Sequence, residues 1–224
     1  DPRMRNAFHD DLDRVSDQLV AMTGMVGTAM KRATEALVNA DLGIAESVIA
    51  ADDDIDQVRR QVDDLSVDLL ARQQPVATDL RMVVTAMHMA SDIERMGDLA
   101  RHIAKIARMR YPNRAVPAEV LPHITSMSEC AIDLAAKTGE AIDSKDVHAA
   151  LAIQQADEKM DELHRQIFQA LHSERWDHPT ETAVDITLLS RYYERFGDHA
   201  VAVANRIVYL VTGRYGDPDE GLSR

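Results

Sequence analysis

An acidic pentapeptide that occurs twice limits what this chain can fold into. Residues 94–98 read Glu-Arg-Met-Gly-Asp, and residues 194–198 read Glu-Arg-Phe-Gly-Asp. The repetition extends beyond the motif, because Asp52 corresponds to Asp157 at an offset of 105 residues, against an offset of 100 at the motif. The second copy is therefore five residues shorter, and a connection between helices would absorb that difference. We interpret the chain as an internal repeat of one supersecondary unit.

Both copies have the apolar spacing of long helices. Apolar residues recur every three or four positions, and the nine glycines and seven prolines cluster between the periodic stretches. Asp41 is positioned to cap the second helix, and Thr78 or Asp79 to cap the third. The sequence thus predicts an all-α protein built as two tandem three-helix bundles. The expected helices run over about 4–40, 42–74, 79–110, 118–142, 146–174 and 180–212.

The segment Tyr111-Pro-Asn-Arg-Ala-Val-Pro117 interrupts the helical pattern in the middle of the chain. It holds two prolines in seven residues, which is typical of a linker. We therefore expect two domains, one over residues 1–112 and one over residues 113–224, each a three-helix bundle.

Charge and cysteine content narrow the class of function. The chain has 25 Lys and Arg against 38 Asp and Glu, a formal charge of -13, which would repel a phosphate backbone, so we expect no nucleic-acid partner. The single cysteine, Cys130, excludes an intrachain disulfide. With no apolar signal stretch at the N-terminus and no apolar run of about 18 residues, we expect a cytoplasmic protein that reaches a membrane only through partners.

Each copy carries two carboxylate pairs at i and i+4, which share a helix face. If the middle and last helices of the first copy form an antiparallel hairpin, Asp56 and Glu94 each lie 19 residues from Pro75, and Asp52 and Asp98 each lie 23 residues from it. All four should therefore lie at matching heights, and the second copy keeps this arrangement. The predicted ligand set is Asp52, Asp56, Glu94, Asp98, Asp157, Asp161, Glu194 and Asp198.

Such clusters favour a bound cation. Like charges at i and i+4 destabilise a helix by roughly 0.2 to 0.5 kcal/mol per pair, and facing pairs repel further unless something positive intervenes. Carboxylate oxygens suit hard ions such as Mg²⁺, Mn²⁺, Ca²⁺ or ferric iron. Zinc and an empty site stay open as well. Gly97 and Gly197 leave space on the motif face for an ion, its waters or a neighbouring helix.

Alternatives to metal binding are also compatible with these residues. The acidic pairs may be read as a solvated face, and Arg95 and Arg195 as salt-bridge partners that neutralise the carboxylates. Residues 161–164 match one half of a carboxylate-x-x-His di-iron pattern, but Arg59 stands at the corresponding position of the first copy, which disfavours a ferritin-like oxidase. We interpret His164 as a surface or packing residue.

Basic and imidazole side chains flank both motifs. Residues 101–110 form a basic helix end, interpreted as a solvated face or a docking patch. His199, next to Asp198, is a candidate to support the carboxylates from behind. The sequence shows no phosphate-binding glycine loop, no nucleophile with an evident base and no zinc spacing, so we expect no enzyme.

Four segments resemble the PhoU family of phosphate-transport regulators. They are QQPVATDLR at 73–81, SDIERMGD at 91–98, YERFGDHAV at 193–201 and VYLVTG at 208–213. The resemblance covers essentially the whole chain and implies two similar three-helix bundles in tandem. It also implies that the same eight carboxylates are the family's metal-associated E(D)xxxD positions. His102 and Ala202 stand where many relatives have asparagine.

By resemblance, the protein is a negative regulator of phosphate uptake and of the phosphate-starvation response. Such proteins act by contact, linking the ATPase subunit of a phosphate ABC transporter to a phosphate-sensing histidine kinase, and a homodimer is compatible with the amphipathic helices. Two other hypotheses stay open. One is a carboxylate-bridged metalloenzyme, a phosphohydrolase or an oxidase. The other is a metal-free helical scaffold whose acidic pairs serve only docking.

Overall fold

The computed structural model describes residues 2–214; Asp1 and residues 215–224, which end the second predicted domain, lie outside it. All secondary structure in that part of the chain is helical, and three helices follow three, as predicted. The six helices are α1 (Pro2–Asn39), α2 (Leu42–Gln73), α3 (Ala77–Arg110), α4 (Leu121–Ser144), α5 (Val147–Leu171) and α6 (Thr180–Thr212).

The middle helices of the two repeats begin in the same way. Asp41 precedes α2, and its side chain accepts a hydrogen bond from the backbone N–H of Ile44 at 2.9 Å. Asp146 precedes α5 and accepts from the N–H of His148 at 3.0 Å. Each aspartate satisfies one of the first backbone donors of its helix. The expected cap at Asp41 is confirmed.

Two predicted helix starts were wrong. α3 begins at Ala77, so Thr78 and Asp79 lie inside its first turn and do not cap it. The negative charge of Asp79 still interacts favourably with the positive end of the helix dipole. α4 begins at Leu121 rather than near residue 118. Pro122 occupies the first turn of α4, where its missing N–H costs nothing and its fixed φ suits a helix.

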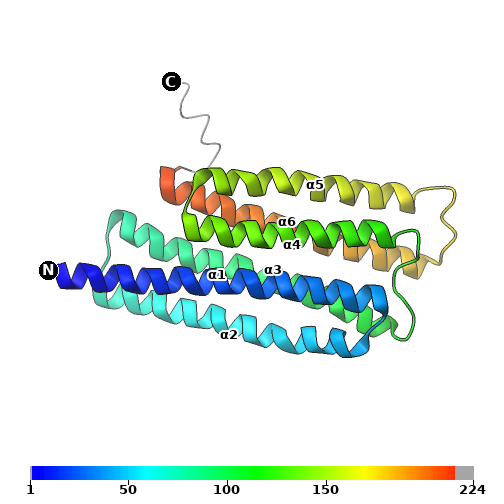
Figure 1. Cartoon of the computed structure of the whole chain (residues 1–224), viewed down its shortest axis with the longest axis horizontal. Helices are drawn as coiled ribbons and strands as arrows, with labels where there is room; N and C mark the ends of the chain where they lie inside the picture. The colour runs from blue at the N-terminus through cyan, green and yellow to red at the C-terminus, as the bar shows by residue number, and fades with distance from the viewer. Residues whose placement is uncertain (1, 215–224) are drawn as a thin grey trace, which may run out of the picture.

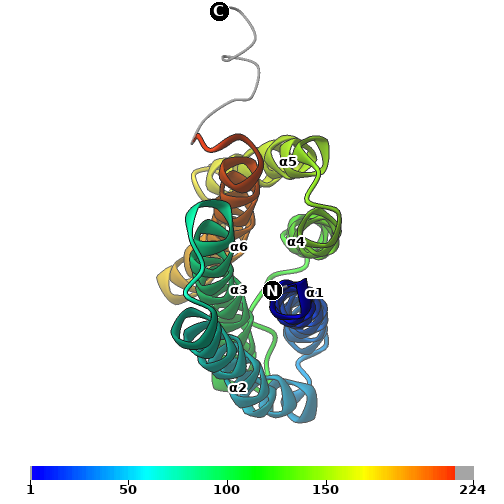
Figure 2. The same cartoon turned by 90° about the vertical axis from the view of Figure 1, so that its left-hand side faces the viewer.

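The six helices lie side by side along the long axis of the molecule (Figure 1). In the first repeat α2 packs on α3 as a hairpin, and in the second α5 packs on α6 in the same way. Between the repeats, α1 lies against α4 and α3 lies against α6. Viewed from the end, α1 and α4 lie on one side of the row formed by α2, α3, α6 and α5 (Figure 2). The repeats thus meet along two helix pairs, and their buried apolar side chains form one continuous cluster.

Polar contacts join the repeats as well. The hydroxyl of Tyr193, fully buried in α6, lies 2.5 Å from Thr34 Oγ1 of α1. At the end of α3, Arg110 Nε donates to Asp185 Oδ2 of α6 at 2.6 Å. The packing shows no gap at the domain boundary predicted near residue 112. Whether the two repeats are separate folding units stays a prediction.

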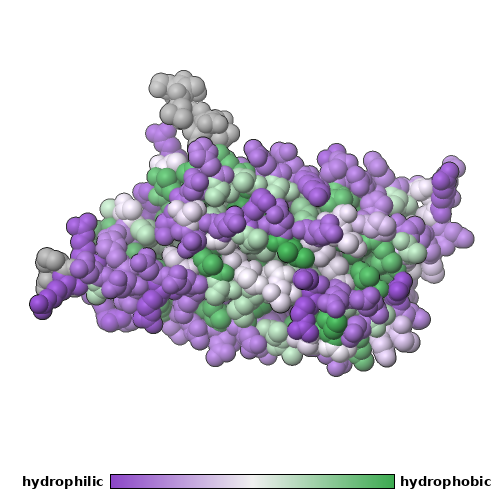
Figure 3. Space-filling view, in the orientation of Figure 1, coloured by the Kyte–Doolittle hydropathy of each residue, from purple (hydrophilic) through white to green (hydrophobic). Residues whose placement is uncertain are grey.

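Small residues allow α1 and α4 to approach closely. A Cβ built on Gly27 would lie 3.3 Å from Ala135 Cβ, and one on Gly139 would lie 2.6 Å from Thr23 Oγ1. These residues line a shallow groove of about 570 Å³ along the two helices. Pale and green residues gather in the middle of this face (Figure 3). No helix in the part of the chain that is described is both long and apolar enough to cross a membrane.

Candidate metal centre

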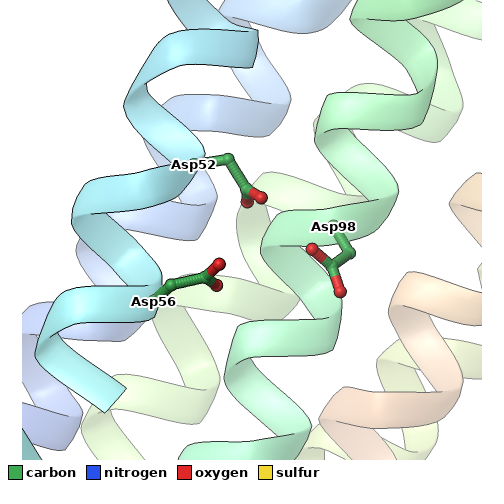
Figure 4. Close-up of side chains that lie close together, drawn as sticks. All are labelled: Asp52, Asp56 and Asp98. Carbon is green, nitrogen blue, oxygen red and sulfur yellow. The ribbon is translucent and has the colours of Figure 1, made fainter. Parts of the chain in front are cut away.

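Three of the predicted carboxylates of the first repeat converge between α2 and α3. Asp52 and Asp56 project from α2 and Asp98 from α3, and each offers an oxygen within 4.8 Å of the others' (Figure 4). The antiparallel hairpin brings them to the same height, as the residue spacing predicts. Asp52 is buried, with 2% of its surface exposed, whereas Asp56 and Asp98 are partly open to solvent. We call this group the first acidic cluster.

Burial and the neighbouring carboxylates make ionisation of Asp52 and Asp56 unfavourable. The pKa of Asp52 is raised from 3.8 to about 7, first by burial and then by the charges of Asp98 and Asp56, against the opposing charge of Arg101. Burial and Asp98 likewise raise the pKa of Asp56. Both carboxylate oxygens of Asp52 and Oδ1 of Asp56 are buried and accept no hydrogen bond from any residue described. A cation between them would supply what these oxygens lack.

Glu94, the fourth predicted ligand of this repeat, lies outside the group. Its Oε2 forms an ion pair with Arg59 Nη1 at 2.9 Å, and Arg59 Nε also lies 3.2 Å from Asp63. On the other side of the cluster, Arg101 Nη1 lies 3.3 Å from Asp52 Oδ2. Two arginines therefore flank the three converging aspartates.

The second repeat places its carboxylates differently. Asp157 is buried in α5, with 9% of its surface exposed, while Asp161 and Asp198 are exposed. Glu194 lies 3.2 Å from His164 Nε2 and 2.9 Å from Arg191 Nη1. Within residues 2–214, these four carboxylates do not converge as closely as the three of the first cluster. We call them the second acidic group.

Asp157 is nonetheless the residue most in need of a positive neighbour. Its pKa is raised to about 7, first by burial and then by the charges of Asp161, Asp198 and Glu194. At the position that corresponds to Arg101, the second repeat has Val201. Asp157 Oδ1 is buried and accepts no hydrogen bond from the residues described. Its charge is therefore less compensated than that of Asp52.

The motif glycines make room for the facing helix. A Cβ on Gly197 would lie 2.2 Å from Asp157 Oδ1, and one on Gly97 would lie 3.0 Å from Ile55 Cδ1 and 3.4 Å from Asp52 Oδ1. Of the three occupants that the sequence left open, the facing helix takes this space. The absence of a side chain at Gly197 lets the buried carboxylate reach the backbone of α6.

The motif arginines do not neutralise the carboxylates. Among residues 2–214, neither Arg95 nor Arg195 has a carboxylate oxygen within 4.0 Å, so the predicted alternative in which they form salt bridges with the motif is not what the structure shows. The side chains that contact them are Arg59, Arg101, Arg191 and His164.

Sequence reasoning did not identify these four side chains as partners of the carboxylates, although the positions of two of them carried a signal. Arg59 and His164 occupy corresponding positions of the repeats, and each contacts the motif glutamate of its own repeat. His164, interpreted as a surface or packing residue, packs against the ring of Phe168 with centroids 4.8 Å apart and also faces Glu194. Its Nδ1 also lies 2.6 Å from Ser190 Oγ, so both ring nitrogens have polar partners. His199, the expected supporting residue, instead contacts Asp92 Oδ1 at 3.2 Å.

The residues fit a hard cation. The donor atoms are carboxylate oxygens, several of them buried without a donor, and they come from two helices that are already packed together. This chemistry suits Mg²⁺, Mn²⁺, Ca²⁺ or ferric iron better than soft thiophilic ions.

Comparison with known proteins agrees with the repeat. The family model described as PhoU domain matches residues 19–107 and again residues 124–207. A phosphate-specific transport system accessory protein, PhoU homolog 2 of Mycobacterium tuberculosis, is 45% identical over 212 residues, covering 95% of this chain and 100% of that protein. PhoU homolog 1 of Mycobacterium leprae is 43% identical over 216 residues, covering 96% and 97%.

Two crystal structures have the same fold. The phosphate transport system regulatory protein PhoU from Streptococcus pneumoniae aligns with a TM-score of 0.84 at 25% identity, covering 94% of this chain and 99% of that one. PhoU from Pseudomonas aeruginosa aligns with a TM-score of 0.82 at 29% identity, covering 92% and 100%.

Proposed function

The chain belongs to the PhoU family, and from this premise we propose that it is a regulatory adaptor that restrains phosphate uptake and the phosphate-starvation response by direct contact. The observation that carries the proposal is the extent of the match. Both repeats fit the family model, and two phosphate-transport accessory proteins align with this chain over 100% and 97% of their length. A role in regulating phosphate transport follows from that membership; the partners and the sign of regulation are proposed.

The proposed partners are the ATPase subunit of a phosphate ABC transporter and a phosphate-sensing histidine kinase. Both would be met in the cytoplasm, where we place the protein. An adaptor of this kind works by binding one conformation of a partner better than another, which shifts the populations of the two. The long helical faces of the molecule offer the surface for such contacts, and we propose a homodimer as the working form.

We propose that the first acidic cluster and the second acidic group are metal sites within this adaptor. Asp52, Asp56 and Asp98 would hold the ion of the first repeat, and Asp157 with Asp198 would contribute to that of the second. A bound cation would neutralise the buried carboxylates. The chain's own part is to hold α2 against α3, and α5 against α6, so that the ligands stay at matching heights. The remaining members of the predicted ligand set are Glu94, Asp161 and Glu194.

The adaptor role is tested by deletion and capture. A strain that lacks the gene should express phosphate-starvation genes in high phosphate, and the tagged protein should retain the transporter ATPase or the kinase on a column. Normal repression in the deletion strain would count against the proposal. Loss of a phosphohydrolase or oxidase activity with Asp98→Asn would favour the metalloenzyme alternative instead.

A further inference from the structure

A small polar cavity lies between the two repeats, next to both motifs. It has a volume of about 200 Å³ and is formed where the middle of α3 faces α6. The two helices run antiparallel, since Arg81 near the start of α3 lies over the ring of Tyr209 near the end of α6. The lining includes Arg95, Asp98 and His102 from α3, with Tyr192, Arg195 and His199 from α6. We call it the inter-repeat cavity.

The motif arginine of each repeat lines this one cavity. Neither Arg95 nor Arg195 has a carboxylate within ion-pairing distance in the described part of the chain, because the motif carboxylates are engaged by other cations. Two arginines without a carboxylate partner, both exposed to solvent, therefore line one cavity in a chain whose formal charge is -13.

The other walls are held in place by contacts between the repeats. Asp92 of α3 lies 3.2 Å from His199 Nδ1 and 3.2 Å from Arg206 Nε of α6. The ring of His102 stacks on that of Tyr192, with centroids 5.3 Å apart. Each imidazole keeps at least one N–H donor whatever its protonation state. The cavity thus combines two solvent-exposed arginines with two histidine rings whose positions are set by contacts between the repeats.

We propose that the inter-repeat cavity binds a small tetrahedral oxyanion, inorganic phosphate, between the guanidinium groups of Arg95 and Arg195. Guanidinium forks match phosphate oxygens and give charge-assisted hydrogen bonds. The cavity is smaller than the roughly 300 to 1,000 Å³ of sites for drug-sized ligands, which favours a free ion over a nucleotide. This inference rests on the cavity itself and does not depend on the proposed regulatory role.

Asp98 gives the cavity a means of selecting phosphate over sulfate. It is the one carboxylate of the lining, so the two arginines leave the site with a net positive charge. An ionised carboxylate accepts hydrogen bonds only. Phosphate near neutral pH still carries an O–H that can donate to Asp98, whereas fully ionised sulfate has no proton to donate and would be repelled.

Calorimetric titration with inorganic phosphate tests the site. The protein is first treated with a chelator, so that phosphate cannot bind through a metal at the first acidic cluster, and ionic strength is held constant. We expect wild-type protein to bind phosphate. Arg95→Gln or Arg195→Gln should weaken binding by about tenfold or more, and the double variant should lose it. Lysine at either position should retain part of the affinity.

Arg175→Gln is the matched control. Arg175 is exposed in the connection between α5 and α6, so the substitution removes the same charge at a position outside the cavity. Its affinity for phosphate should equal that of wild type, and circular dichroism should show all variants folded. Folded wild-type protein that binds no phosphate would overturn the proposal, as would a double variant that binds as well as wild type.

Two further arms identify the ligand class. Sulfate should bind more weakly than phosphate, and Asp98→Asn should narrow that difference. Tighter binding of adenosine monophosphate than of inorganic phosphate would contradict the assignment to a free ion. Phosphate binding that appears only after metal is added, and that survives both arginine substitutions, would contradict the cavity as its site. A strain that regulates normally with an Arg95→Gln, Arg195→Gln protein would leave the adaptor role intact.

Discussion

Two buried aspartates, one in each repeat, have strongly raised pKa values. Asp52 and Asp157 occupy corresponding positions of α2 and α5, and burial together with neighbouring carboxylates raises the pKa of each to about 7. Arg101 offsets part of the charge of Asp52, while Asp157 has only carboxylates among the charges that shift its pKa. Each residue favours a state in which its charge is removed or balanced, by a proton or by a metal ion.

The pH dependence of stability follows from the raised pKa of Asp157. In metal-free protein, the folded state keeps a proton on this residue up to about pH 7, whereas the unfolded chain releases it near 3.8. The folded state therefore loses stability as pH rises from about 4 to 7. Asp157→Asn should raise the melting temperature at pH 8 by about 2 to 4 °C or more, and by less at pH 5.

Thermal denaturation of chelator-treated protein at the two pH values measures this effect. Asp54→Asn, which removes an exposed carboxylate on α2, is the control and should change little at either pH. A gain from Asp157→Asn that is equal at both pH values would show that burial does not perturb this carboxyl group.

Alanine at three helical glycines should give a graded series. A helix-interior Gly→Ala change stabilises by roughly 1 kcal/mol where there is room. Gly24 has nothing within 4 Å of an added Cβ, Gly97 would meet Ile55 at 3.0 Å, and Gly197 would meet Asp157 at 2.2 Å. Unfolding free energies measured in urea should therefore rank Gly24→Ala highest and Gly197→Ala lowest, the last destabilised by about 1 to 3 kcal/mol. Equal effects at the three positions would contradict the packing described.

Sequence reasoning at this scale found the carboxylates and missed their neighbours. The i, i+4 pairs and their equal distances from Pro75 suffice to bring Asp52, Asp56 and Asp98 together. The partners of Glu94 and Glu194 depend on which rotamers the long side chains of Arg59 and Arg191 adopt once the hairpins pack. Residue spacing does not determine that.

At the scale of helices, the hairpins could be predicted and the contacts between repeats could not. Turn residues and apolar period fix the ends of α2 and α3 within a few positions and set them antiparallel. The pairing of α1 with α4 and of α3 with α6 depends on which apolar faces stay uncovered after the hairpins form. That requires the three-dimensional shape of both repeats, including the close approach at Gly27 and Gly139.

The hydrogen bond from α6 to α1 offers a test of the contact between repeats. Tyr193 is fully buried, and Tyr193→Phe removes its hydroxyl while Thr34 keeps a bond to Met30 O at 3.0 Å. We expect a loss of about 1 kcal/mol, the usual net value of a buried hydrogen bond. In a double-mutant cycle with Thr34→Val, the two losses should be less than additive. Fully additive losses would mean that the two hydroxyls do not interact.

At the scale of the whole molecule, the two repeats behave as partners in one core. Buried residues from all six helices belong to a single apolar cluster. Arg110, at the end of the first repeat, forms an ion pair with Asp185 of the second. The two predicted domains, 1–112 and 113–224, each contain one repeat, and each repeat covers an apolar face of the other. Such an arrangement favours cooperative unfolding.

We therefore expect calorimetry of the metal-free chain to show one thermal transition. Its calorimetric and van't Hoff enthalpies should agree, because exposing one repeat would uncover the apolar face of the other. Two resolved transitions, or a stable monomeric fragment of residues 1–112, would mean that each repeat folds independently.

Elemental analysis tests most directly whether the first acidic cluster is a metal site. Untagged protein, purified without chelators, is measured by inductively coupled plasma mass spectrometry beside two variants. One carries Asp52→Asn, Asp56→Asn and Asp98→Asn; the other carries Asp10→Asn, Asp13→Asn and Asp17→Asn on the first turns of α1, which removes the same number of charges. We predict a stoichiometric hard metal in the wild type and the α1 variant, reduced in the cluster variant. Folded wild-type protein without metal, or metal that is equal in all three, would contradict the account.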